Sequence, residues 1–352
     1  MPVQNIGIMI PCITESKLKQ FKALVDGARV VSVISHTHPD GDAVGSSAAL
    51  GAYLRLSLGK DAVCILPDTP PASISFIIPQ TVPYIFADVN PAAAEERILG
   101  SDLIIMIDLN KPSRAENLEA WIRKSPAQRI LIDHHLGPEE EAFNLVFSTP
   151  DVSSASELLY WMLRSLAGPA ENIPAEAREA LCAGMTTDTN NFANSVFPST
   201  FTMASELIAS GTDRNAIIAK LYNQYRENRI RLMGWMQCHE LKITPSGAAS
   251  MILTKELQNR FGYQEGETEG LVNVPLAIDK VRLSILLTQH RDCMRVSIRS
   301  KVGTSARDLA MRYFNGGGHE NASGGKLVFG VDIPDASAAG AYVEKALKEY
   351  MG

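Results

Sequence analysis

The stretch that decides the fold reads RVVSVISHTHPDGDAVGSSAALGAYLRLSL over residues 29–58. Residues 29–35 form a short apolar run rich in β-branched side chains, which predicts a buried strand. Residues 43–58 are rich in small apolar side chains and predict a helix. A polar segment with histidines and aspartates lies between them. A strand that passes through such a loop into a helix begins a βαβ unit, so the stretch predicts a parallel sheet with polar chemistry at its carboxyl edge.

The same alternation continues along the first two-thirds of the chain. Short apolar runs occur at 61–66, 103–109 and 129–133, and helical stretches lie at 116–123 and 154–166. Strands that alternate with helices predict a larger α/β domain with a doubly wound, mostly parallel sheet. We place this domain at residues 1–214 and a linker helix at 215–240.

After residue 240 the pattern changes. Residues 249–253, 281–288 and 294–300 alternate apolar and polar side chains as strands do, and residues 305–314 and 336–350 predict helices. Residues 241–352 are therefore predicted to form a second, smaller α/β domain with a mixed sheet. The predicted fold class is α/β with two domains.

Composition excludes several classes of protein. With 352 residues the chain is long enough for two domains with cores of their own. Its apolar runs are too short to span a bilayer. The five cysteines lie far apart without a C-x-x-C pair, which favours reduced thiols and a cytoplasmic protein. No basic residue precedes Lys17, so we expect the opening residues to be part of the fold or a loose arm, not a signal peptide.

The charge distribution bounds the ligand. A net charge of −6 argues against a stable partnership with long nucleic acid, which usually requires a basic face. Residues 282–326 nevertheless hold eight Lys and Arg residues against three acids. A local basic region of this size suits a ligand with a few phosphates.

Four clusters of metal-ligating side chains stand where strands are expected to end. Each cluster alone has an ordinary explanation, because an Asp at such a position is usually a turn or helix cap. Five of the seven histidines, however, fall in only three motifs, namely two of these clusters and the glycine-rich segment that ends at His319. The clusters are His36, His38, Asp40 and Asp42; Asp108 at the end of LIIMID; Asp133, His134 and His135 at the end of ILIDHH; and Asp188 within GMTTDTNNF.

The chemistry of these side chains fits a two-metal site. Carboxylates forced together repel one another and raise one another's pKa, and two divalent cations would cancel four negative charges. The carboxylates are Asp40, Asp42, Asp108 and Asp188, of which Asp108 can bridge both ions. Carboxylates with imidazoles favour Mn²⁺, with Mg²⁺ or Co²⁺ as alternatives. Two ions roughly 3.5–4 Å apart can clamp both oxygens of a phosphoryl transfer, with a bridging hydroxide as nucleophile.

A glycine-rich segment supplies a second motif. Residues 315–319 read NGGGH and follow a predicted helix. Consecutive glycines let backbone N–H groups approach a phosphate, although the segment is no Walker A loop, because position 320 is Glu. A plain glycine turn stays open as an explanation. The basic region, which includes Arg299, favours a phosphate or nucleotide cradle.

Together these residues resemble a known family. The ordered series His36-x3-Asp40-x-Asp42, Asp108, Asp133-His134-His135 and Asp188 resembles the DHH phosphoesterases of the RecJ-like superfamily. The motif GGGHxxAxGG at 316–325 resembles their DHHA1 carboxyl domain. The resemblance covers roughly residues 30–326, and the ordered set is far more specific than the Asp-His-His triplet alone.

The resemblance implies a role for each position. His36, Asp40 and Asp108 would hold one metal ion, and Asp42, Asp108, His134 and Asp188 the other. His135 would contact the scissile phosphate or support the metal shell, and Asp133 would orient its neighbours. His38 lies where the family varies. Arg299, Gly316, Gly317, Gly318 and His319 would bind the substrate, in a cleft between the DHH and DHHA1 domains.

One position departs from the family pattern. The family often has Asp-Thr-Gly where this chain has Asp188, Thr189 and Asn190. Because Asn adopts left-handed backbone conformations more readily than most residues, we expect the metal site to survive. The shape of the substrate site near residues 190–194 is where a difference is expected.

The resemblance also narrows the substrate. RecJ-like exonucleases carry a further OB-type domain, membrane-bound cyclic dinucleotide phosphodiesterases carry membrane and sensor segments, and class II pyrophosphatases lack the GGGH domain. The chain is most similar to the compact oligoribonuclease and pAp phosphatase (nanoRNase) type, which acts on short RNA or on 3′-phosphoadenosine 5′-phosphate. Dimers occur in the family, so a homodimer is open. An exopolyphosphatase-like hydrolase, a catalytically silent nucleotide-binding sensor and a metal-independent α/β protein are the alternatives.

Overall fold

The computed structural model describes residues 9–352. The chain divides into two compact units, residues 1–224 (unit 1) and residues 225–352 (unit 2). Residues 1–8, which hold most of the expected opening arm, lie outside the described residues. Among the described residues, no helix is both long enough and apolar enough to cross a membrane.

The sheet of unit 1 is parallel throughout its described part and has the strand order β3-β2-β1-β4-β5-β6. The strand order reverses beside β1, so β1 and β4 flank the point where ligands gather in such sheets. The strands are β1 (Val30–Ile34), β2 (Asp61–Leu66), β3 (Tyr84–Phe86), β4 (Leu103–Ile107), β5 (Gln128–Asp133) and β6 (Leu145–Ser148).

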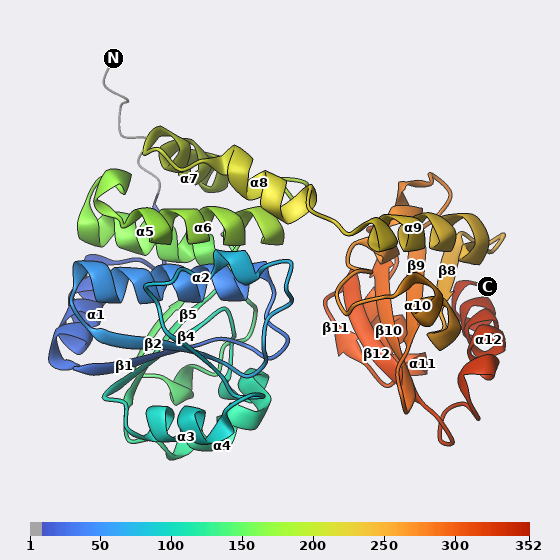
Figure 1. The fold of residues 1–352 in the computed structure, drawn as a ribbon, viewed down its shortest axis with the longest axis horizontal. Coiled ribbons are helices and arrows are strands. Elements are labelled where there is room, and N and C mark those ends of the chain that lie inside the picture. Colours follow the sequence, from blue (N-terminus) through green and yellow to red (C-terminus); the bar gives the residue numbers. More distant parts are fainter. Residues whose placement is uncertain (1–8) are drawn as a thin grey trace. The chain divides into compact units, whose positions relative to one another are not determined.

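Helices cover both faces of this sheet, as Figure 1 shows. Alternate residues of one strand enter two different cores: Ile105 and Ile107 pack under α1, α2, α5 and α6, whereas Ile104 and Met106 pack against α3 and α4. This burial on both faces explains the continuous apolar runs and confirms the predicted doubly wound sheet. The helices are α1 (Glu15–Gly27), α2 (Gly41–Ala52), α3 (Pro91–Leu99), α4 (Glu119–Lys124), α5 (Ala155–Ala167), α6 (Ala175–Asp188), α7 (Pro198–Ala209) and α8 (Arg214–Tyr222).

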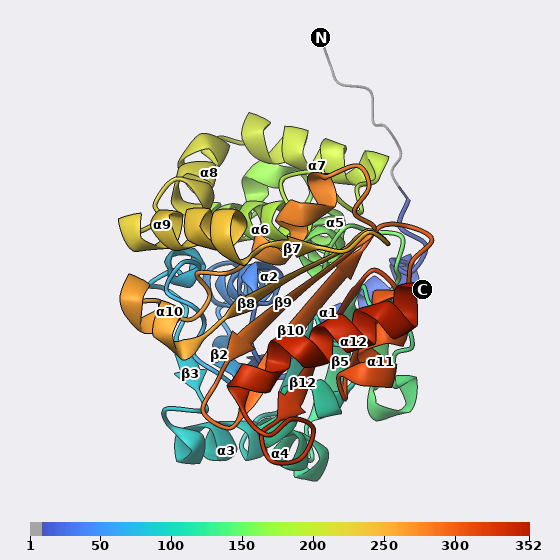
Figure 2. The ribbon, with the colours of Figure 1, turned by 90° about the vertical axis from the view of Figure 1, so that its right-hand side faces the viewer.

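Unit 2 contains a mixed sheet with the order β11-β12-β10-β9-β8-β7 within its described residues. Strands β8 and β9 are parallel and the other pairs are antiparallel. One face packs on α11 and α12, visible along the strands in Figure 2, and the other packs on α9 and α10. The elements are α9 (Glu227–Trp235), β7 (Lys242–Ile243), β8 (Ala248–Leu253), α10 (Lys255–Phe261), β9 (Leu283–Gln289), β10 (Cys293–Ser300), α11 (Ala306–Tyr313), β11 (Gly317–Gly318), β12 (Ala322–Val328) and α12 (Ala339–Met351).

Residues 215–240, expected as one linker helix, are not continuous. Helix α8 ends at Tyr222, helix α9 begins at Glu227, and a π-helical turn, Met236–Glu240, follows it. Asn223 is the C-cap of α8, and Arg226 takes an extended conformation as the N-cap of α9. Asn favours caps because its side chain competes for backbone hydrogen bonds, which accounts for the interruption.

Candidate metal centre

Three neighbouring strands deliver ligating side chains to one edge of the unit 1 sheet. His36 follows β1, Asp108 follows β4, and His134 follows β5. Because β4 pairs with both β1 and β5 in parallel register, the carboxyl ends of the three strands lie side by side. The sequence-predicted convergence of these residues is therefore present in the fold.

Asp40 and Asp42 come from the start of α2. Asp40 is the N-cap, and its Oδ1 accepts hydrogen bonds from the backbone N–H groups of Asp42 and Ala43, both at 3.0 Å. Asp42 is buried, whereas Asp40 is exposed. The segment is thus a helix cap that also holds candidate metal ligands, so the two explanations for an Asp at a strand end are compatible here.

Asp188 does not follow a strand, contrary to the expectation from GMTTD. It is the last residue of α6. The threonines next to Asp188 are accommodated by bonds to preceding carbonyls: Thr187 Oγ1 donates to Gly184 O and Thr189 Oγ1 donates to Met185 O, each at 2.8 Å. Such bonds satisfy hydroxyls within a helix, and the local sequence therefore did not distinguish the two elements.

Two glycines bring α2 and α6 close enough for Asp42 and Asp188 to meet. A Cβ on Gly45 would lie 2.6 Å from the Ala180 carbonyl oxygen, and a Cβ on Gly184 would lie 3.0 Å from Asp42 Oδ1. The first distance is too short for a real side chain, and a Cβ on Gly184 would in addition lie 2.1 Å from Ser156 Oγ. The absence of side chains at this seam therefore sets the separation of the two carboxylates.

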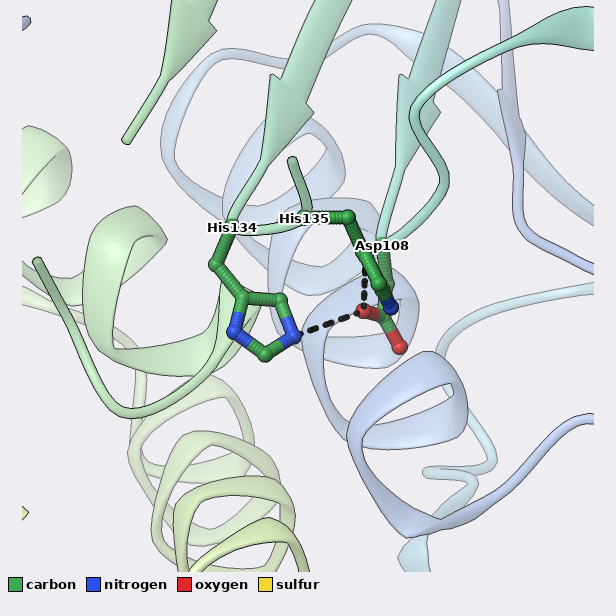
Figure 3. Close-up of side chains that lie close together, drawn as sticks. All are labelled: Asp108, His134 and His135. Carbon is green, nitrogen blue, oxygen red and sulfur yellow. Dashed lines mark ion pairs between the residues drawn. The ribbon is translucent and has the colours of Figure 1, made fainter. Parts of the chain in front are cut away.

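The described residues form three groups of possible metal ligands, and within each group the ligand atoms lie within 4.8 Å of one another. Figure 3 shows Asp108 with His134 and His135, which turn toward it from the end of β5. The groups are His36, Asp40 and Asp108; Asp42, His134 and Asp188; and Asp108, His134 and His135. The first two coincide with the two ligand sets that the resemblance implies, apart from the sharing of Asp108.

Asp108 faces both sets with different oxygens. Its Oδ2 lies 3.4 Å from His36 Nε2, and its Oδ1 lies 3.5 Å from His134 Nε2. Asp108 is buried and adopts φ +60°, a left-handed conformation that few residues other than Gly, Asn and Asp tolerate. This conformation ends β4 and places the carboxylate between the two imidazoles.

The electrostatics of the site show strong mutual perturbation. Burial would lower the pKa of both imidazoles, but the nearby Asp108 carboxylate outweighs it and raises the pKa of His36 to about 9 and that of His134 to about 10. Burial raises the pKa of Asp42, with the charge of Asp108 adding to it, and raises the pKa of Asp188 to about 7. Burial opposes ionisation of Asp108 as well, yet the two imidazoles hold its pKa well below the usual range.

The donor set fits divalent cations. His36 Nδ1 contacts Thr37 O at 2.8 Å, which leaves Nε2 facing the carboxylates. His134 Nε2 lies 3.5 and 3.7 Å from oxygens of Asp108 and Asp188, longer than ordinary hydrogen bonds. Ligand atoms about 2.1 Å from one small cation lie roughly 3 Å apart, so modest closure of these distances would complete a coordination shell.

The remaining residues of the predicted centre, Asp133, His135 and His38, are held by hydrogen bonds or by a neighbouring carboxylate. Asp133 accepts from the backbone N–H of His135 at 3.0 Å and lies 2.7 Å from its Nδ1, so it orients that ring. His38 lies on the loop after β1 with φ +52° and turns to Asp68. Asp68 also accepts from Thr37 Oγ1 at 2.5 Å and from His38 N at 2.6 Å.

Sequence analysis missed Asp68. It stands after β2, so the strand-end rule that found Asp108 could have found it. Its neighbours Pro67 and Thr69 carry no ligand chemistry, which is why no cluster drew attention to it.

The segment after Asp188 is unusual in its backbone. Asn190, Asn191 and Phe192 have φ of +46°, +56° and +68°, three consecutive left-handed residues. Asn190 thus adopts the conformation expected of Asn at this position. Phe192 stacks on Phe201, with ring centroids 5.2 Å apart. Contacts of this kind hold a strained segment in place.

Unit 2 places Arg299 beside the glycine motif. Arg299 on β10 pairs with Ala322 on β12, and Gly317 and Gly318 pair with β12 on its other side. The half-buried Arg299 guanidinium donates to Ile298 O at 2.9 Å. The expected loop at 316–319 is thus partly the short strand β11.

Three comparisons with known proteins agree with this arrangement. The sequence pattern of the DHH family, N-terminal domain, matches residues 30–185. The bifunctional oligoribonuclease and PAP phosphatase NrnA of Bacillus subtilis is 29% identical over 303 residues, covering 84% of this chain and 89% of that protein. A probable manganese-dependent inorganic pyrophosphatase of Streptococcus mutans is 28% identical over 159 residues, covering 45% of this chain and 48% of that protein.

A solved structure matches the whole fold. The crystal structure of an exopolyphosphatase-related protein from Bacteroides fragilis has a TM-score of 0.90 and 33% sequence identity. The match covers 97% of this chain and 98% of that chain. Both units of the fold therefore occur together in another protein.

Proposed function

The chain belongs to the DHH family, and from this premise we propose that it is a phosphoesterase that hydrolyses short oligoribonucleotides, 3′-phosphoadenosine 5′-phosphate, or both. The observation that carries the proposal is the convergence of His36, Asp40 and Asp108 with Asp42, His134 and Asp188 at the carboxyl edge of one parallel sheet. The name of the Bacillus subtilis relative supports the substrate class.

The proposed cofactor is a pair of Mn²⁺ ions, with Mg²⁺ or Co²⁺ as alternatives. His36, Asp40 and Asp108 would hold one ion; Asp42, Asp108, His134 and Asp188 would hold the other. The separate orientation of the two Asp108 oxygens supports its sharing. When bound, such ions neutralise phosphate charge and make hydroxide available at neutral pH.

The chain's own residues prepare the site for this chemistry. Asp133 fixes the ring of His135 and favours the tautomer with a proton on Nδ1. We assign His135 to contact with the scissile phosphate or support of the metal shell. Because Asp42 and Asp108 are buried, water is excluded from one side of the site, which strengthens its electrostatic interactions.

Arg299, Gly316, Gly317, Gly318 and His319 are proposed to bind the phosphates or nucleotide of the substrate. Arg299 contributes a fork of donors suited to phosphate, and it lies in the strand next to β12, which pairs with Gly317 and Gly318. The excess of basic residues over 282–326 supports an anionic ligand here.

A second candidate activity is hydrolysis of polyphosphate. The similarity to the exopolyphosphatase-related protein of Bacteroides fragilis favours it. Both activities would use the same proposed metal centre, but polyphosphate hydrolysis cleaves a phosphoanhydride bond, whereas hydrolysis of short RNA or pAp cleaves a phosphate ester.

One assay distinguishes the candidates. Purified protein with Mn²⁺ is given pAp, RNA of two to five nucleotides, long single-stranded DNA and polyphosphate in parallel, and Asp108→Ala is the matched control. We expect chelator-sensitive turnover of pAp or short RNA, little turnover of the long strand, and none by the variant. Turnover of polyphosphate alone would transfer the function to the second candidate, and turnover of nothing despite bound Mn²⁺ would refute hydrolysis.

A further inference from the structure

Helix α5 begins against the metal centre. The backbone N–H of Ala155 donates to Asp42 Oδ2 at 2.7 Å, and the N–H of Ser156 donates to Asp42 Oδ1 at 3.0 Å. Both oxygens of a proposed metal ligand are therefore held by the first turn of a helix whose positive end faces them. The position of that turn determines where Asp42 points.

Glu157 lies in the same turn, and its side chain is buried with none of its surface exposed. Its Oε2 accepts hydrogen bonds from Ser153 N at 2.8 Å, Ser153 Oγ at 2.6 Å and Thr200 Oγ1 at 2.6 Å. Its Oε1 lies 3.4 Å from Trp161 Nε1. Glu157 has no ion pair with a Lys, Arg or His among residues 9–352.

A buried carboxylate without a cation is costly unless donors surround it. Here the donors come from the residues just before α5, from α5 itself and, through Thr200, from α7. An amide could not replace it: the Gln oxygen would have to accept three bonds, and a Gln N–H would face the Trp161 N–H. The site thus requires a carboxylate, although nothing at this position would contact substrate.

We propose that Glu157 is a positioning residue of the metal centre: it fixes residues 153–154 to α7, and so holds the first amides of α5 against Asp42. This inference rests on the proposed function, because it assigns Asp42 a metal-binding role. The simpler account treats Glu157 as a helix cap only, since Ser154-x-x-Glu157 matches the capping-box pattern and Ser154 Oγ accepts from Glu157 N at 3.0 Å. The two accounts differ in whether metal binding depends on Glu157.

The experiment compares Glu157→Gln with Glu206→Gln. Glu206 on α7 also binds α5, through Tyr160 and Arg164 further along that helix, but within residues 9–352 it makes no hydrogen bond or ion pair with residues 153–156. Binding of Mn²⁺ alone is measured by the loss of the free-ion EPR signal, and thermal unfolding of the metal-free proteins is measured alongside it. The binding measurement needs no substrate, so its result is independent of which ester the enzyme hydrolyses.

We expect Glu157→Gln to weaken Mn²⁺ binding about 10- to 100-fold, the usual effect of removing a residue that orients a ligand. Its kcat should recover at high Mn²⁺ with KM unchanged. Glu206→Gln should lower the unfolding temperature comparably and leave Mn²⁺ affinity unchanged. If Glu157→Gln fails to fold, Thr200→Val, which removes one donor to Glu157 together with the acceptor of the Phe197 N–H, should show the same loss of affinity to a smaller degree.

Two results would overturn the proposal. Wild-type Mn²⁺ affinity in a destabilised Glu157→Gln would reduce Glu157 to a cap, and equal loss of affinity in both variants would make the effect one of general stability. A wild-type protein that binds no Mn²⁺ would refute the metal centre and this inference together. A wild-type protein that binds Mn²⁺ but hydrolyses no ester would refute only the proposed activity.

Discussion

In unit 1 the motif residues of separate elements turn toward one another, whereas in unit 2 most motif glycines are fixed by their own backbone surroundings. A Cβ on Gly316 would collide with the Gly324 carbonyl, and a Cβ on Gly325 would collide with that of Phe314. Gly318 has φ +140°, which side chains rarely allow. Gly317 alone among these four glycines has no atom within 4 Å of an added Cβ.

The difference teaches that two equally recognisable motifs can have different physical origins. The ionised carboxylates of Asp42 and Asp188 cost stability where they stand, since burial and the charge of Asp108 raise their pKa. The glycines of unit 2 are required for the chain to pass through a crowded hairpin. A functional role is therefore the better explanation for the motif of unit 1. In unit 2, a functional role can be distinguished from a packing role only at Gly317 and Arg299.

The largest effect is expected at Asp108. Asp108→Ala should reduce hydrolysis to the uncatalysed background, because it removes the carboxylate that faces both ligand sets. Far-UV circular dichroism should remain unchanged. Asp108→Asn is the control that keeps the left-handed backbone preference while removing charge, and it should also be inactive. Full activity in the Ala variant would exclude a shared bridging carboxylate.

The contrast between the units predicts a dependence on pH that arises in unit 1. The folded pKa of His36, about 9, lies above its ordinary value of 6.5. Its contribution to stability is therefore complete below pH 6.5 and is lost as pH rises through 9. Asp188, with its pKa raised to about 7, acts in the same direction at lower pH. The free energy of unfolding of the metal-free protein, measured with urea, should thus fall as the pH rises from 6.5 to 9.

The affinity for Mn²⁺ should increase as the pH rises through the same range, because the ligands of the ion must lose their protons. His36→Gln should flatten the stability profile of the metal-free protein, whereas substitution of the exposed His290 by Gln should leave it unchanged. Stability that rises from pH 6.5 to 9 without metal would contradict the electrostatic account.

Two alanine substitutions test the packing explanation in unit 2. Gly316→Ala should destabilise the fold by about 1–3 kcal/mol, the usual cost of overpacking. Gly317→Ala should change stability by no more than about 0.5 kcal/mol. If it nevertheless raises KM, the open side of Gly317 is where substrate approaches. Equal destabilisation by both substitutions, measured in urea, would remove the distinction between the two glycines.

The smallest effect is expected at Arg299. Arg299→Ala should raise KM about tenfold with little change in kcat, as loss of one hydrogen-bonding group to a charged phosphate predicts. Arg295→Ala, four residues earlier on β10, is the control, because Arg295 is exposed and lies 3.7 Å from Glu265. Unchanged kinetics for Arg299→Ala would place the substrate elsewhere.

Most of the fold of unit 1 could be predicted from the sequence, because the strands of a parallel sheet are buried on both faces and are easily recognised. Apolar runs buried on both faces identify β1, β4 and β5, and their carboxyl ends must meet. Asp188 was assigned to the wrong element, since threonine-rich GMTTD suits a strand and a helix equally. Its place near Asp42 depends on the glycines of α2 and α6, a tertiary contact without a local signal.

Supporting residues were the hardest to find. Asp68 and Glu157 have no ligand-like neighbours in sequence, and Ser154-x-x-Glu157 by itself signals only the start of a helix. Their importance depends on what they hold, which the fold alone brings together. The metal and substrate roles of the predicted residues stay predictions for the experiments above.

The seam between α2 and α6 has a consequence for how this protein can change over time. Because a Cβ on Gly45 would lie 2.6 Å from the Ala180 carbonyl oxygen and 2.8 Å from Gly184 Cα, the spacing of Asp42 and Asp188 depends on a direct contact between the main chains of α2 and α6. We expect core substitutions that leave this contact between main chains in place to leave that spacing unchanged. The centre is thereby insulated from drift in the core around it, and engineers could redesign most of unit 1 for thermostability while leaving these two positions untouched.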